Sequence, residues 1–202
     1  IHEKVTKSPV NPYGFSKFVI EQVLADMNRA YGFRSASLRY FNAAGADPEG
    51  ELGEDHAEET HLIPNAIRAI LGKIPHLTLF GTDYPTPDGT CVRDYVHVND
   101  LASAHIAALE LVEKENRSVD FNLGSENGYS VQEVIATLEK ISGKAVPKKM
   151  GPRRPGDAPR LVADSSKAKR ELNWKPQYGL EEIVRTAYNW MTKHPHGYAQ
   201  KV

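Results

Sequence analysis

The sequence predicts an α/β protein with a mainly parallel sheet and a smaller α/β appendage. Segments with the apolar period of a strand alternate with segments that have the period of a helix along the chain. Of its 202 residues, 40% are hydrophobic, which is enough to build the core of one or two domains. Strands that are connected through helices are typical of parallel sheets.

The first helix is expected to begin at Asn11 and to end near Tyr31. Asn11 is a favoured N-cap residue, and Pro12 suits the first helical position, where its missing N–H costs nothing. Gly32 is a typical stop signal. Apolar residues recur every four positions, so this helix is expected to face a core through one group of side chains: Phe15, Val19 and Val23.

The remaining elements follow from the same periods and from cap residues. Strands are expected at residues 34–41, 77–81, 91–98 and 119–124, with a long loop after the first of them. Helices are expected after Pro64, from Asp100 to about Lys114, and over residues 130–143, 165–172 and 179–193. The helix from Asp100 carries apolar side chains at three positions: Ala102, Ile106 and Leu109.

The composition excludes several classes of partner and site. The formal net charge of −1 gives no electrostatic reason to expect nucleic acid or an anionic membrane. The single cysteine, Cys91, excludes an internal disulfide and a Cys-rich metal site, and we interpret it as structural. No apolar run reaches the length of a membrane span, so a cytoplasmic protein is expected.

Tyr13 and Lys17 lie four residues apart in the first helix and therefore project from one face. A positive charge about 4 Å from a phenolate stabilises it by about 4 kcal/mol at an effective dielectric constant of about 20. This pair can therefore form an activated tyrosine. The alternative is a packed tyrosine beside a solvated lysine, and the pair needs its surroundings to decide between the two.

Six segments supply those surroundings: "NPYGFSK", "LRYFNAAGADP", "THLIP", "DYPTPDGTCVRDYVHVNDLA", "NLGS" and "NWMTKHPHGY". Together they resemble the extended short-chain dehydrogenase/reductases, and among them the UDP-glucose (UDP-galactose) 4-epimerase family. The resemblance implies a Rossmann-type domain that binds NAD, of which residues 1–42 are the remainder. It implies a nucleotide-sugar-binding domain over residues 43–202, with a segment of about residues 92–115 returning to the first domain. It also implies a homodimer.

The sequence departs from this family in one respect. The family begins with a Gly-rich turn that lets the backbone approach the cofactor pyrophosphate, and no G-x-x-G-x-x-G stretch occurs here. The serine or threonine that the family places upstream of the tyrosine is also absent. Because both features are missing, we expect this chain to be the C-terminal part of an epimerase, inactive by itself, and its start at Ile1 rather than Met also suggests a fragment.

The resemblance implies transient oxidation of the sugar at C4, with no net redox change. Tyr13 would remove the proton of the 4-hydroxyl while the hydride passes to NAD, and the 4-keto sugar would rotate before reduction. Lys17 would support the phenolate and contact the nicotinamide ribose, and Phe41 would lie beside the nicotinamide. The implied contacts to the UDP-sugar are Asn42, His61, Leu62, Thr78, Phe80, Arg93, Arg154, Asp157 and Leu161.

Several of these residues are expected to contact a specific part of the ligand. Thr78 and Phe80 would bracket the uracil, and the forked guanidinium groups of Arg93 and Arg154 would hold the two phosphates. The resemblance places Asp157 at the ribose hydroxyls. It places at Leu161 the side chain that limits sugar size, and a leucine there would admit N-acetylated sugars to some extent.

His61 also lies near His56, Glu58 and Glu59, so a metal site can be drawn. No fixed ligand spacing supports it, and no metal is expected. Two other functions stay open. One is a related NAD-dependent nucleotide-sugar dehydratase or decarboxylase, and the other is a non-catalytic module that binds nucleotide sugars.

Overall fold

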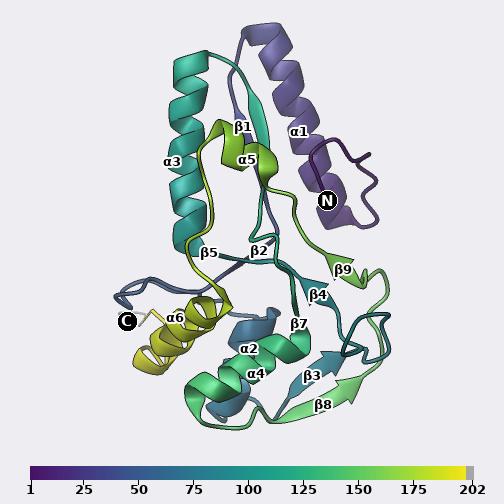
Figure 1. The fold of residues 1–202 in the computed structure, drawn as a ribbon, viewed down its shortest axis with the longest axis vertical. Coiled ribbons are helices and arrows are strands. Elements are labelled where there is room, and N and C mark those ends of the chain that lie inside the picture. The colour runs from purple at the N-terminus through teal and green to yellow at the C-terminus, as the bar shows by residue number, and fades with distance from the viewer. Residues whose placement is uncertain (199–202) are drawn as a thin grey trace.

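The structure is a computed structural model that describes residues 1–198 (Figure 1). The last four residues of the second predicted domain, 199–202, lie outside the described residues. The helices are α1 (Pro12–Tyr31), α2 (Leu62–Ile70), α3 (Val98–Glu115), α4 (Val131–Ser142), α5 (Ser166–Glu171) and α6 (Leu180–Lys193). The predicted helices are thus confirmed, and their ends differ by a few residues at most.

The strands form small sheets in which parallel pairing dominates, as predicted. They are β1 (Ala36–Tyr40), β2 (Asn42–Ala44), β3 (Leu77–Phe80), β4 (Val92–Arg93), β5 (Tyr95–His97), β6 (Val119–Leu123), β7 (Tyr129–Ser130), β8 (Lys148–Gly151) and β9 (Arg160–Leu161). β1 pairs with β6, β2 with β5, β3 with β8 and β4 with β9, all in parallel. β4 also pairs with β7 in the antiparallel sense.

The single strand predicted over residues 91–98 is wrong, because the chain divides there into β4 and β5 in two different sheets. Asp94 lies at the division, fully buried. Its carboxylate accepts hydrogen bonds from the Ser125 N–H at 2.7 Å and the Ala163 N–H at 3.0 Å. A buried carboxylate needs hydrogen-bond donors of this kind. The backbone passes from one sheet to the other at Asp94, where the carboxylate reaches these donors.

The cap signals of α1 are confirmed, because the Asn11 side chain accepts a hydrogen bond from the Gly14 N–H and Gly32 ends the helix with φ of 67°. The predicted buried face is wrong. Phe15, Val19 and Val23 are exposed, and α1 has no buried residue. The half-buried side chains of α1 include Phe18, Glu21, Leu24 and Met27 instead, and of these Glu21 forms an ion pair with Arg39 on β1. Apolar residues occur nearly all round α1, so their period alone could not select the packing face.

The helix α3 begins at Val98 rather than Asp100, because the His97 side chain accepts a hydrogen bond from the Asn99 N–H and caps it. Its buried residues include Leu101, Ala104 and Ala108. The three apolar positions singled out in the sequence, Ala102, Ile106 and Leu109, are exposed instead.

Two hydrophobic cores organise the molecule. One packs α2, α4 and α6 against β3, with Ile67, Leu138 and Ile183 fully or almost fully buried. The other packs α3 and α5 against β6, with Phe121 fully buried and Trp174 also buried. In the view of Figure 1, α1 and α3 flank the β1–β6 pair, and the three-helix core lies at the other end of the molecule.

The second core takes residues from several parts of the chain. It joins Val96, Leu101 and Ala104 to β6 and to the segment around Ala168 and Trp174. The predicted return of residues 92–115 to the first domain is compatible with this core, but the domain boundary itself stays a prediction. No helix within residues 1–198 is both long enough and apolar enough to cross a membrane.

Candidate active site

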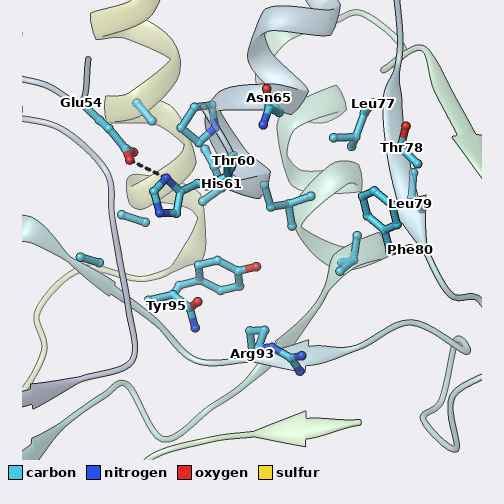
Figure 2. Close-up of a pocket in the computed structure, with 18 of the residues that line it drawn as sticks. Glu54, Thr60, His61, Asn65, Leu77, Thr78, Leu79, Phe80, Arg93 and Tyr95 are labelled. Carbon is cyan, nitrogen blue, oxygen red and sulfur yellow. Dashed lines mark ion pairs between the residues drawn. The ribbon is translucent and has the colours of Figure 1, made fainter. Parts of the chain in front are cut away.

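A cavity of about 580 Å³ lies between β3, the start of α2, β4–β5 and α6 (Figure 2). The predicted site residues that line it are Asn42, His61, Leu62, Thr78, Phe80, Arg93, Arg154 and Asp157. The N-terminus of α2 forms part of the cavity wall, and His61 is the N-cap of this helix. Pro64 falls in the first turn of α2, where its missing N–H is tolerated, so the helix begins before this proline rather than after it.

Two guanidinium groups and an aromatic ring lie in the cavity wall. Arg93 donates from Nη1 to the Ala158 carbonyl at 2.8 Å, and its Nη2 lies 3.3 Å from Asp157 Oδ1. The guanidinium carbon of Arg154 lies 3.9 Å from the centroid of the Phe80 ring. This arrangement offers forked donors for oxyanions beside a flat apolar surface, which suits a phosphorylated aromatic ligand.

Asn42 and Tyr95 connect this wall to the sheet. The Asn42 side-chain amide donates to the Asp94 carbonyl at 2.8 Å, and this bond holds the Asn42 side chain in place at the start of β2. Burial raises the pKa of the Tyr95 phenol, so this hydroxyl stays protonated as a hydrogen-bond donor. In Figure 2 the Tyr95 side chain extends between those of His61 and Arg93.

Four predicted site residues do not line the cavity: Tyr13, Lys17, Phe41 and Leu161. Tyr13 and Lys17 are neighbours, as their spacing predicts, because Lys17 Nζ lies 5.1 Å from the centroid of the Tyr13 ring. Tyr13 is 73% exposed. Leu161 is half-buried on β9, where it is the direct partner of Arg93 on β4.

The position of Tyr13 along α1 follows from two contacts to β1. Arg34, before β1, donates to Asn28 late in α1, and Arg39 donates from Nε to Glu21 Oε1 at 2.6 Å, earlier in α1. α1 therefore runs antiparallel to β1. Tyr13 lies about 12 Å beyond Glu21 and Asn42 about 10 Å beyond Arg39, so the two residues end at a similar level. That level is the carboxyl end of β1, the edge at which open α/β sheets bind ligands.

Glu54, His56, Glu59 and His61 meet at one rim of the cavity, although their spacing along the chain does not predict this. His61 Nδ1 lies 2.9 Å from Glu54 Oε1 and 2.7 Å from Glu59 Oε1. Burial and then the charge of Glu59 raise the pKa of Glu54, which the two histidines oppose. Of these four, Glu54 and His61 line the cavity itself.

Other residues that line the cavity were not predicted as site residues, among them Glu54, Asn65, Tyr95, Trp190 and Met191. Tyr95 had an available signal, because it follows Arg93 by two positions in an extended segment and can share its face. Trp190 and Met191 come from α6, more than a hundred residues along the chain from β2, and no local pattern points to their place in the cavity.

Residues 1–187 of the chain match a family model that is described as GDP-mannose 4,6 dehydratase. The chain belongs to this family. Within the family its relatives carry a more specific description. A UDP-glucose 4-epimerase of Halalkalibacterium halodurans is 48% identical over 200 residues, which are 98% of this chain and 60% of the relative. The chain thus spans about three fifths of the length of such relatives.

Solved structures give the same result. The UDP-glucose 4-epimerase of Brucella ovis, in complex with NAD, superposes with a TM-score of 0.91 at 46% identity over 94% of this chain and 58% of that one. The enzyme of Bifidobacterium longum, in complex with NAD+ and UDP, gives a TM-score of 0.92 at 42% identity over 98% and 60%. These comparisons confirm the resemblance to UDP-glucose 4-epimerases and the α/β fold.

Proposed function

We propose that this chain supplies the nucleotide-sugar pocket and the Tyr–Lys pair of an enzyme that interconverts UDP-galactose and UDP-glucose. The observation that carries the proposal is the cavity wall in which Arg93 and Arg154 stand beside Phe80. Two forked cations suit a diphosphate, and a flat ring with Thr78 on the same strand suits a pyrimidine base. The names of the relatives agree with this ligand.

NAD fits this chain in part. Tyr13 and Lys17 lie together at the carboxyl end of β1, where a nicotinamide ring could meet them, and Phe41 follows directly after that strand. The chain contains no Gly-rich turn for a dinucleotide pyrophosphate. We therefore assign the nicotinamide end to Tyr13, Lys17 and Phe41, and the rest of the cofactor to a part of the protein upstream of Ile1.

When bound, NAD supplies a reversible hydride acceptor for C4 of the sugar. Tyr13 accepts the proton of the C4 hydroxyl as this carbon is oxidised, and returns it when the carbon is reduced from its other face. Lys17 stabilises the phenolate form of Tyr13 electrostatically. Arg93 and Arg154 hold the diphosphate throughout the reaction, so the 4-keto sugar can rotate without leaving the pocket.

The assay extends the chain upstream to a natural start and incubates it with UDP-galactose, with Tyr13→Phe as the matched variant. UDP-glucose formed by the parent and lost in Tyr13→Phe would support the proposal, because this change removes only the hydroxyl. A 4-keto-6-deoxy or pentose product would indicate a dehydratase or decarboxylase. UDP binding without any product would favour the non-catalytic module. The 202-residue chain alone is expected to be inactive, and sustained turnover by it would contradict this.

We further propose that the complete protein is cytoplasmic and homodimeric, with α1 in the dimer interface. α1 exposes four apolar side chains along one side: Phe15, Val19, Ile20 and Val23. An apolar helix face of this extent is typical of an interface. Equilibrium sedimentation of the complete protein, with Val19→Lys as the variant, tests the proposal. A complete protein that is monomeric at all concentrations would refute it.

A further inference from the structure

The rim of the cavity holds two copies of a Glu-x-His pair that face each other. Glu54 and His56 form the first pair, and Glu59 and His61 form the second. One ligand atom from each side chain lies within 4.8 Å of all the others. His56 Nε2 lies 3.6 Å from Glu54 Oε1, and Figure 2 shows His61 turned toward Glu54. The backbone between the two pairs therefore brings four side chains of metal-ligand type close together.

The charges in this cluster are not balanced. Within residues 1–198, both carboxylates have histidines as their ion-pair partners, and no lysine or arginine lies within 4.0 Å of either. The Glu59 side chain is only 5% exposed. A pair of carboxylates in a partly buried place is costly unless a cation neutralises them. The histidines carry a positive charge only when they are protonated, so a bound cation would neutralise both carboxylates without that proton.

The chemistry of the donors selects the kind of cation. Two imidazole nitrogens and two carboxylate oxygens suit Zn²⁺ and similar transition metals, whereas Mg²⁺ and Ca²⁺ prefer oxygen ligands alone. Bonds of about 2.0–2.2 Å to a tetrahedral metal put the ligand atoms about 3.4 Å apart. Three of the six separations are 2.7, 2.9 and 3.6 Å, which bracket that value, and all six are within 4.8 Å. Small side-chain movements would therefore complete the site.

We propose that Glu54, His56, Glu59 and His61 bind one divalent transition-metal ion of the Zn²⁺ type at the rim of the cavity. The ion lies between His61 Nδ1 and the two carboxylates, and it leaves Nε2 of the same ring free. Since Glu54 and His61 line the cavity, the ion also cancels two negative charges beside the pocket that holds Arg93 and Arg154. The site does not depend on the proposed epimerase activity.

The test titrates the tag-free 202-residue chain with Zn²⁺ by calorimetry in a buffer that does not chelate, and with Co²⁺ by visible absorption. Two ligand variants are used, Glu59→Gln and His56→Gln. Glu59 is almost buried and its variant could lose stability, whereas the half-exposed His56 can be changed safely. His105→Gln on α3 and His196→Gln on the exposed chain after α6 are the matched controls.

The expected result is one equivalent of Zn²⁺, the intense absorption of four-coordinate Co²⁺, and at least about tenfold weaker binding in both ligand variants. The control variants should bind as the parent does. Binding should also raise the midpoint of thermal unfolding, because the metal binds the folded chain. Absence of binding, binding that is unchanged in His56→Gln, or equal losses in the control variants would each overturn the proposal.

Discussion

The Arg154 guanidinium stacks on the Phe80 ring, whereas the adjacent Arg153 lies over Tyr84 with its Nε 2.8 Å from Asp83 Oδ1. Two consecutive arginines thus have different surroundings, and of the two only Arg154 lines the cavity. Replacing either arginine by glutamine removes one positive charge from the same loop, so the two variants can be compared directly.

We predict that Arg154→Gln weakens binding of UDP to this chain by about ten- to a hundredfold, the loss expected for hydrogen bonds to a charged group. Arg153→Gln should change the dissociation constant by less than about threefold, since its exposed ion pair with Asp83 contributes little. Calorimetric titration with UDP measures both. Equal effects of the two changes would remove Arg154 from the diphosphate site.

The buried carboxylate of Asp94 joins three segments, because it accepts hydrogen bonds from Ser125, Glu126 and Ala163. Asp94→Asn places an amide NH₂ group against those donors, so we predict a loss of about 2–4 kcal/mol in the free energy of unfolding. Urea denaturation followed by circular dichroism measures it. Asp26→Asn, at an exposed pair with Arg29, should cost less than about 0.5 kcal/mol. Equal stabilities of the two variants would contradict this role of Asp94.

His97 predicts how stability depends on pH. Burial lowers the pKa of His97, and the charges of Asp100, Asp47 and Glu182 oppose the shift only in part. The folded chain therefore binds fewer protons at this site than the unfolded chain, whose histidine has a pKa of about 6.5. The contribution of His97 is complete above that pH and decreases as the pH falls through about 6.5.

The measurement is the urea midpoint between about pH 7.5 and pH 5.5, compared with that of His97→Gln. The variant loses the hydrogen bond between His97 Nε2 and Thr186 Oγ1, so its stability is lower at every pH. Its decline toward low pH should be shallower, because the titrating group is gone. Parallel declines in both proteins would exclude His97 as a source of the pH dependence.

The sequence was sufficient where the deciding interactions are local. Asn11 and Gly32 fix the ends of α1, and Ser130 begins α4 through a capping box with Glu133, all through contacts within a few residues. The division of β4 from β5 was not predictable, because it follows from bonds between Asp94 and residues far along the chain.

Long-range contacts also decide the packing of α1 and the shape of the candidate site. The ion pair between Arg39 and Glu21 selects which side of α1 meets β1, and an apolar period cannot show that pair. The two Glu-x-His pairs were visible in the sequence, but their meeting depends on the path of an irregular loop. Resemblance to a family supplied roles for separate residues, and the structure adds which of them share one cavity.

Leu161 gives a prediction about sugar size in the complete protein. Leu161 on β9 is paired with Arg93 on β4, and directly paired residues project from the same face, so its side chain lies on the side of the proposed diphosphate site. Leu161→Tyr adds bulk there, so kcat/KM for UDP-N-acetylglucosamine should fall about tenfold or more relative to that for UDP-glucose. Leu161→Met, of similar volume, should leave the ratio unchanged. Because a general loss of activity lowers both values together, only a changed ratio supports Leu161 as the limit on sugar size, and an unchanged ratio in Leu161→Tyr excludes it.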